Sequence, residues 1–269
     1  MTQTAAARSP VSKLSRANMR SELTTFSEFY NRYYTSSYGK QASDWLLGEF
    51  RSVVSASGAT RASVKVFTRS WAQNSILGAI LERSPSEVVV VDTHLDSVND
   101  RNRVRLSSSK ITAGQGVNTL EFHWYAGEEA GLLGSGEIFD SYRPSSAVVK
   151  AIAAAGHDGM RQQPNGRHHG LYGLGPRGAT MLTRVGLQYT TTGYIHTQCG
   201  YGCSDHVSAF VIEAAMSRMS PHIHTDWDAA STLNFSHMLE HAMPAVGYAY
   251  ELTLASIWEK SARPGGWVV

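Results

Sequence analysis

The chain has only two cysteines, no long apolar run and almost no excess of charge of either sign, and the last two absences each exclude a class of protein. No stretch is apolar over the length of a membrane span, and residues 1–15 lack the apolar core of a signal peptide. The net charge is +2 without a basic run or stripe, so neither a nucleic acid nor a membrane surface is supported as a partner.

Those two cysteines, Cys199 and Cys203, lie close together in the sequence. Their spacing suits a small-loop disulfide, a free pair of thiols or part of a metal site, and it does not choose among the three. The 11 histidines carry more information, because one of them, His94, lies near an acidic residue at the end of a predicted strand.

The length and composition fit one α/β domain. With 269 residues, of which 42% are hydrophobic and 17% are charged, the chain can bury a full core. We expect residues 1–14 to be disordered and residues 15–262 to form the domain, with an irregular segment near residues 156–187.

Apolar periodicity and turn residues predict the secondary structure. Helices are predicted over Ser15–Tyr30, Trp45–Gly58, Val148–Ala155 and from an Asn234 N-cap onward with a kink at Pro244, and strands over Ser63–Ser70, Ser75–Leu81, Val88–Val91, Leu120–Tyr125, Thr190–Thr197 and Ala209–Glu213. Turns or links are predicted at Asn31–Lys40 and Ser84–Ser86, and no clear element at residues 99–116.

The four consecutive valines Val88–Val91 are typical of a strand that is buried on both faces, at the centre of a helix-covered sheet. His94 and Asp96 follow directly, at the end of this strand. One interpretation is a metal ligand with its supporting carboxylate; the other is a core histidine with Asp96 as its hydrogen-bonded partner.

A second chemical motif is the stretch Glu121–Ser135, E-F-H-W-Y-A-G-E-E-A-G-L-L-G-S. Its alternating first half predicts a strand with unlike faces, and its small and apolar second half suits a helix, so Glu128 and Glu129 lie at a strand-to-helix junction. One carboxylate of such a pair can ligate a metal while the other takes a proton from water. Alternatively, the pair merely favours a helix N-terminus, where acids suit the macrodipole.

If the two strands are parallel neighbours, His94, Asp96, Glu128 and Glu129 converge at one edge of the sheet. The loop P-H-I-H-T-D at residues 221–226 offers a further imidazole ligand.

Taken together, the motifs resemble one enzyme family. V-V-V-V-D-T-H-L-D-S, W-Y-A-G-E-E-A-G-L-L-G-S, C-G-Y-G-C-S-D-H and P-H-I-H-T-D occur in this order, followed by L-N-F-S-H-M-L-E-H-A. This set resembles the secreted leucine-type zinc aminopeptidases, particularly their fungal branch, over most of the chain except residues 99–116 and 156–187.

The resemblance implies an α/β domain with a mixed central sheet between helices and two zinc ions at the ends of its strands. Carried over by motif, His94 binds one zinc, Glu129 and His224 bind the other, and Asp158 is a possible remnant of a further ligand. Glu128 is the general base that takes the proton from the attacking water, and Asp96 orients His94.

The resemblance also implies a disulfide between Cys199 and Cys203 beside the substrate pocket, with Tyr201 as a substrate contact. The expected substrates are peptides with a free N-terminus and a large apolar first residue. We further expect a secreted monomer, although the sequence as given has no signal peptide.

Two departures from the family pattern predict impaired activity. The family has an A-P-G-A-D-D-D-G-S-G-like segment between its His and Glu-Glu motifs, which supplies an aspartate that bridges both zincs. Here Asp100 is the only acid between Asp96 and Glu121, in different surroundings. A Q-D-M-T-G-Y-like motif is replaced by residues around Asp158. The second zinc is therefore doubtful. The alternative hypothesis is a relative that binds peptides without cleaving them. A third hypothesis is a di-zinc hydrolase that binds the other end of its substrate.

Overall fold

In the computed structural model, the described residues are 4–97, 116–145, 147–155, 168–173, 188–191, 193–196, 209–212, 214–225, 227 and 229–255. The helices are α1 (Thr4–Val11), α2 (Arg16–Ser27), α3 (Ser37–Ser57), α4 (Leu133–Tyr142) and α6 (Phe235–Leu254), with short 3-10 helices η1 (Met216–Arg218) and η2 (Ala230–Thr232). The strands are β1 (Ala62–Phe67), β2 (Ser75–Ile80), β3 (Ser84–His94), β4 (Asn118–Tyr125), β5 (Val148–Ala155), β6 (His168–Gly173), β7 (Gly193–His196) and β8 (Ala209–Ile212).

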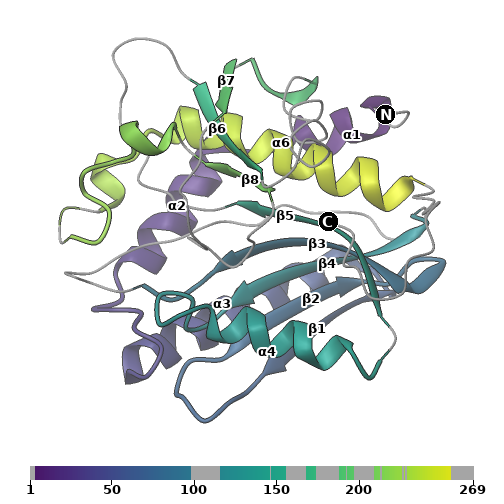
Figure 1. Cartoon of the computed structure of the whole chain (residues 1–269), viewed down its shortest axis with the longest axis horizontal. Helices are drawn as coiled ribbons and strands as arrows, with labels where there is room; N and C mark the ends of the chain where they lie inside the picture. The colour runs from purple at the N-terminus through teal and green to yellow at the C-terminus, as the bar shows by residue number, and fades with distance from the viewer. Residues whose placement is uncertain are drawn as a thin grey trace.

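The strands form one mixed sheet in the order β1-β2-β4-β3-β5-β8-β6-β7, shown in Figure 1. β3 runs parallel to both of its neighbours, β4 and β5. β1 and β2 extend the sheet antiparallel beyond β4, and β6 is antiparallel to β8. This arrangement confirms the predicted α/β class with a mixed central sheet flanked by helices.

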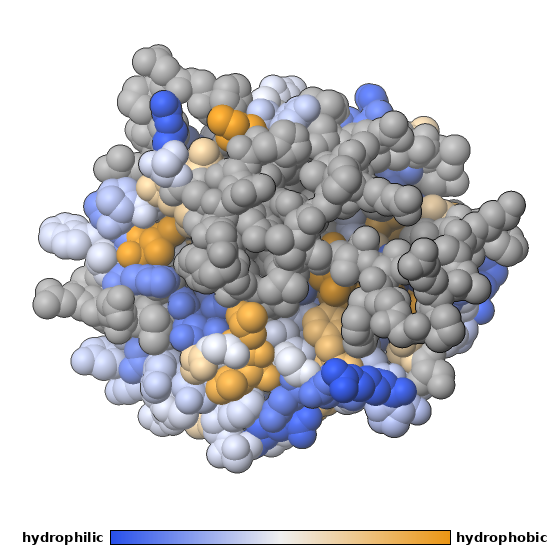
Figure 2. All heavy atoms as spheres, viewed as in Figure 1, coloured by the Kyte–Doolittle hydropathy of each residue, from blue (hydrophilic) through white to orange (hydrophobic). Residues whose placement is uncertain are grey.

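Helices cover both faces of the sheet. On one face, α3 packs Leu46 and Phe50 against Ile76 and Trp124, while α1 and α6 cover the neighbouring strands and bury Val89. On the other face lies α4, which is drawn on the viewer's side of the sheet in Figure 1. The described residues on the face seen in Figure 2 are a mixture of hydrophilic and hydrophobic side chains. Among the described helices, none combines the length and the hydropathy needed to span a bilayer.

Local sequence signals explain where several elements begin and end. The Ser15 side chain caps α2 and accepts a bond from the Asn18 amide, and the predicted N-cap Asn234 accepts bonds from two amides of α6. Gly58 ends α3 in the left-handed conformation, which glycine adopts without steric cost. Val88, Val89 and Val90 are each at most 2% exposed, which confirms a strand buried on both faces.

Other predictions were wrong. Val148–Ala155 is strand β5 and not a helix, because it pairs with β3 on one side and β8 on the other, and this pairing overrides the helix preference of its alanines. β6 lies inside the segment for which we expected no element, residues 156–187. Ser84–Ser86 belongs to β3, with a register shift in place of the predicted turn.

The N-terminal region is also more ordered than expected. Residues 4–11 form α1 where disorder was predicted, and Ala7 is fully buried in the cluster beneath α6. α3 begins at Ser37, well before the predicted Trp45, because Ser36 acts as its N-cap and accepts a bond from the Gly39 amide. Pro244 lies inside α6, as the sequence predicted.

Candidate metal centre

The site lies where β3 and β4 end. The two strands are parallel neighbours, and the last residue of β3, His94, lies opposite Tyr125, the last residue of β4. The carboxyl ends of parallel strands reach the same edge of a sheet, which is the edge where open α/β folds place their ligand sites. The condition for convergence of the predicted residues is therefore met.

A tight turn after β4 directs Glu128 and Glu129 toward this edge. Gly127 has a φ of 71°, in the left-handed region that favours glycine, and a Cβ added there would lie 3.3 Å from the Tyr34 ring. The Glu128 carbonyl then accepts bonds from the amides of Gly131 (2.9 Å) and Leu132 (2.8 Å). α4 begins only at Leu133 and has no acid in its first turn, so the alternative that the pair serves a helix N-terminus is wrong.

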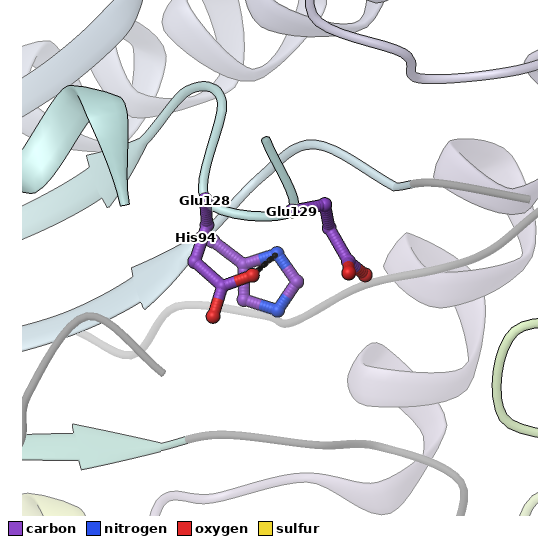
Figure 3. A group of neighbouring side chains, drawn as sticks. All are labelled: His94, Glu128 and Glu129. Atoms are coloured by element: carbon purple, nitrogen blue, oxygen red, sulfur yellow. Dashed lines mark ion pairs between the residues drawn. The ribbon is translucent and has the colours of Figure 1, made fainter. Parts of the chain in front are cut away.

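Three side chains form a compact group that could hold a metal ion. His94, Glu128 and Glu129 each offer one ligand atom, and these atoms all lie within 4.8 Å of one another (Figure 3). In the described part of the chain, this is the one such group of three or more. One imidazole and two carboxylates are a donor set that suits zinc, so these residues fit the predicted metal.

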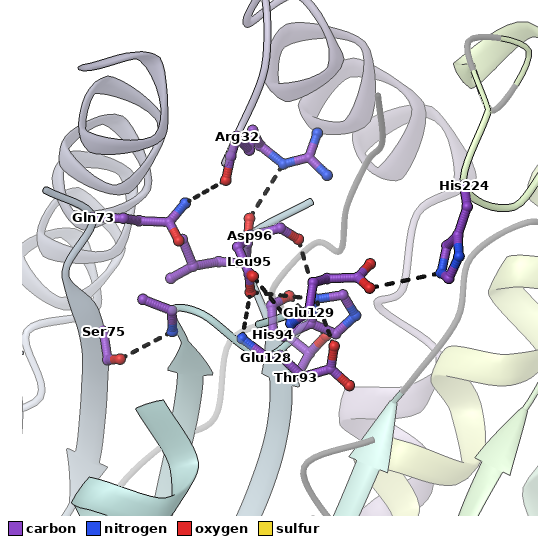
Figure 4. A network of polar contacts seen from close by, with 11 residues as sticks. Arg32, Gln73, Ser75, Thr93, His94, Leu95, Asp96, Glu128, Glu129 and His224 are labelled. Atoms are coloured by element: carbon purple, nitrogen blue, oxygen red, sulfur yellow. Dashed lines mark hydrogen bonds and ion pairs between the residues drawn. The ribbon is translucent and has the colours of Figure 1, made fainter. Parts of the chain in front are cut away.

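Asp96 holds the two glutamates by their backbone. Its carboxylate accepts the Glu128 amide at 3.1 Å and the Glu129 amide at 3.2 Å (Figure 4). Its carbonyl oxygen lies 3.1 Å from Nδ1 of His94, and its carboxylate Oδ1 lies 3.6 Å from that nitrogen. A bond from Nδ1 to the carbonyl leaves Nε2 of His94 available as a ligand atom.

The site carries a strong negative field. Burial lowers the pKa of His94, but the nearby carboxylates of Glu128, Asp96 and Glu129 outweigh burial and raise this pKa well above its usual value. The side chains of Glu128 and Asp96 are 6% and 1% exposed, so water screens their charge little. The buried carboxylates that favour the protonated, cationic form of His94 also favour a bound metal cation.

His224 approaches the group from the loop before α6. Its Nε2 lies 3.6 Å from Oε2 of Glu129, and Figure 4 shows its ring directed at that carboxylate. Its φ of 65° is in the left-handed region, which is uncommon for a residue with a side chain and costs conformational energy. His222, the other histidine of the loop, uses its backbone carbonyl to accept bonds from the amide and hydroxyl of Thr225.

The structure brings together His94, Asp96, Glu128, Glu129 and His224. Four other predicted site residues, Asp158, Cys199, Tyr201 and Cys203, lie outside the described residues. Sequence reasoning missed the link from Asp96 to the glutamate amides and the role of a buried arginine, Arg32, in the same network.

A second buried polar network lies on the α4 face of β4. The Tyr125 hydroxyl donates to Asp92 at 3.0 Å, and His123 is bonded to both Tyr125 (2.9 Å) and Glu121 (2.8 Å). Tyr142 of α4 also donates to Glu121. Burial raises the pKa of Asp92 to about 6, against the opposing effects of His123 and Tyr125. These side chains tie α4 to the sheet.

Comparison with known proteins identifies the relatives of this chain, although no family model matches it. Leucine aminopeptidase 1 of Trichophyton equinum is 38% identical over 288 aligned residues, which cover 90% of this chain and 75% of that protein. The chain belongs to the leucine aminopeptidase family. Leucine aminopeptidase 1 of Sclerotinia sclerotiorum, at 35% identity over 91% of this chain and 73% of its own length, belongs to the same group. The resemblance expected from the motifs is confirmed.

Solved structures show the same fold in this leucine aminopeptidase chain. LapA aminopeptidase of Legionella pneumophila superposes with a TM-score of 0.85 at 24% identity, covering 95% of this chain and 75% of its own. Glutaminyl cyclase of Porphyromonas gingivalis reaches 0.66 at 13% identity, covering 88% and 98%. An aminopeptidase and a cyclase therefore share the fold, so the activity has to be argued from the site.

This leucine aminopeptidase chain is shorter than its relatives within the matched region. The Trichophyton equinum alignment spans 288 positions, whereas 90% of 269 residues is about 242. The relative therefore has internal residues without a counterpart here.

Proposed function

We propose that the protein is a zinc-dependent aminopeptidase that releases N-terminal residues, preferably large and apolar, from peptides. The observation that carries this proposal is the convergence of His94, Glu128 and Glu129 at the end of two central strands, in a chain of the leucine aminopeptidase family.

His94 would hold one zinc ion, Glu129 with His224 would hold a second, and Asp158 would be a further zinc ligand. The 3.6 Å separation of His224 and Glu129 supports this pairing, as does the strained backbone of His224, which persists only where other interactions compensate. Bound zinc would act as a Lewis acid toward the scissile carbonyl and would make water a stronger acid.

Glu128 would be the general base. Its carboxylate would accept a proton from the water that attacks the scissile carbonyl, and it would later donate this proton to the leaving amine. Its side chain is only 6% exposed and its backbone amide is fixed by Asp96, so the carboxylate is held in place and shielded from bulk water. Asp96 would hold the glutamate pair and the His94 ring in one geometry.

The substrate would be a peptide with a free N-terminus, contacted by Tyr201 beside a disulfide between Cys199 and Cys203. A disulfide would fit a protein made for an oxidising compartment, so we include secretion, and a monomeric state, in the proposal.

Activity would be low in this chain. An aspartate that bridges two closely spaced dications offsets their mutual repulsion, and the segment that supplies it in the family has no counterpart here. The shorter length within the aligned region supports this part of the proposal. The same observation favours a second candidate function, a relative that binds peptides without cleaving them.

Hydrolysis of leucyl p-nitroanilide would test the proposal. The protein would be stripped with a chelator, assayed, and assayed again after zinc is restored, with N-acetyl-leucyl p-nitroanilide as the control for the free amine. We expect slow, zinc-dependent cleavage of the free-amine substrate alone. No cleavage at any zinc concentration, together with binding of leucyl peptides, would favour the binding protein.

A further inference from the structure

Arg32 is a buried cation behind the metal group. It lies between α2 and α3 and is only 2% exposed. Its guanidinium lies over the Phe26 ring at 4.7 Å, and its Nε donates to the Leu95 carbonyl at 3.2 Å. Removing a charged side chain from water is costly, and it occurs only where the contacts of the buried side chain offset that cost. The Phe26 ring and the Leu95 carbonyl supply such contacts and fix the guanidinium in one place.

The backbone of Arg32 makes a second link to the same segment. Its carbonyl accepts the Ser97 amide at 3.3 Å. The same carbonyl accepts a bond from Nε2 of Gln73 at 3.0 Å (Figure 4). Gln73 is fully buried, and its backbone amide donates to the Tyr34 carbonyl at 2.9 Å. Arg32 therefore binds the residues on both sides of Asp96, and Gln73 fixes Arg32.

These links lie where the sheet no longer supports the chain. β3 ends at His94, and beyond it the Leu95 amide still donates to the Tyr125 carbonyl at 2.8 Å. Asp96 then bonds the amides of Glu128 and Glu129. Gln73 therefore contacts Arg32, and Arg32 contacts the backbone on both sides of Asp96. The Asp96 carboxylate in turn contacts Glu128 and Glu129.

We infer that Arg32 is a positioning residue for the metal centre: it fixes the backbone on both sides of Asp96 and, through Asp96, the placement of Glu128 and Glu129. The inference deepens the proposed function and rests on it for its catalytic consequence. Its structural part, the ordering of the segment around Asp96, holds with or without a metal.

The test compares Arg32→Met, Arg32→Lys and Gln73→Met with Arg83→Met as the matched control. Arg83 also donates from Nε to a backbone carbonyl, that of Gly116 at 3.3 Å, but at the start of β3, the opposite end of the strand from His94. Arg32→Lys keeps the positive charge but replaces the planar guanidinium, and with it the Nε donor, by a terminal ammonium group. Gln73→Met keeps the length of the side chain but removes the donor to the Arg32 carbonyl.

The first readout is hydrogen exchange of the metal-free proteins, followed over the peptides that contain residues 94–97 and 127–130. We expect Arg32→Met to speed exchange in both peptides by about tenfold or more, Arg32→Lys and Gln73→Met by less, and Arg83→Met not at all. The second readout is zinc affinity by chelator competition, expected to weaken by about 10- to 100-fold in Arg32→Met, with a lower kcat at an almost unchanged KM.

The inference is overturned if folded Arg32→Met exchanges like the control in both peptides and binds zinc within about twofold of the unaltered chain. If Arg32→Met does not fold, Gln73→Met decides: faster exchange at residues 94–97 supports the inference, and unchanged exchange overturns it. If the unaltered chain binds no zinc, the proposed function fails, while the exchange of the metal-free proteins still decides the role of Arg32.

Discussion

Asp96 is the residue whose replacement should show most clearly how the site is assembled. Its side chain is 1% exposed and accepts two backbone amides, those of Glu128 and Glu129. Asp96→Ala would leave both amides without this acceptor in a buried site. Asp96→Asn would retain one carbonyl oxygen as an acceptor and turn an NH₂ group toward the other amide.

The magnitude follows from the number of bonds lost. A hydrogen bond to a charged group contributes about 1.5–3 kcal/mol, so the loss of two in Asp96→Ala should lower the free energy of unfolding by about 3–6 kcal/mol. Asp96→Asn loses one acceptor and should cost about half as much, roughly 1.5–3 kcal/mol. Zinc affinity should fall by about 10- to 100-fold in both variants, because the ligands lose their support.

Urea unfolding of the metal-free proteins would measure the stability, and chelator competition the zinc affinity. Asp44→Asn is the control, since Asp44 forms an exposed pair with Lys40, at 2.6 Å, and such pairs contribute at most about 1 kcal/mol. Equal losses of unfolding free energy in Asp96→Ala and Asp96→Asn, or losses as small as in the control, would refute the reasoning that Asp96 holds the two amides.

Three further predictions concern the ligands, the cysteines and the missing aspartate. His224→Ala should remove more zinc than His222→Ala, because His224 lies against Glu129; metal analysis of both variants decides, and a larger loss from His222→Ala would reverse the choice. Intact mass with and without reduction should show a bond between Cys199 and Cys203, and two free thiols after oxidative folding would count against both the bond and secretion. The chain as given should bind at most one zinc tightly, and grafting an A-P-G-A-D-D-D-G-S-G segment after Asn99 should raise zinc stoichiometry and leucyl-anilide turnover, provided that Asp158 or a restored Asp-Met-Thr-Gly motif reaches the site. Equal zinc and turnover in both chains would make Asp100 the next residue to mutate.

The sequence predicted the parts of the fold that depend on local patterns. The valine run gave the central strand, and alternation in β4 separated Trp124, which packs against α3, from His123, which faces α4. The acidic pair was placed correctly at the end of β4, because a strand-ending glycine precedes it. The helix cap at Asn234 was equally predictable from the sequence.

The parts that failed depend on contacts between distant segments. β5 is rich in alanine and looks helical by itself, and only its pairing with β3 and β8 makes it a strand. Arg32 contacts Leu95, which lies 63 residues away, so no local pattern marks it. The hydrogen bonds from the Glu128 and Glu129 amides to Asp96 use backbone donors, which are the same for almost every residue type and therefore leave no pattern in the sequence.

The most direct test of the central claim, that Glu128 is the base of a zinc aminopeptidase and Glu129 a ligand, is Glu128→Gln with zinc and leucyl-anilide turnover measured on the same preparation. A neutral amide cannot accept the proton, so turnover should fall by about 100-fold or more while zinc content is unchanged. Unchanged turnover would contradict the role of Glu128 as base, and equal loss of zinc and turnover would exchange the roles of Glu128 and Glu129.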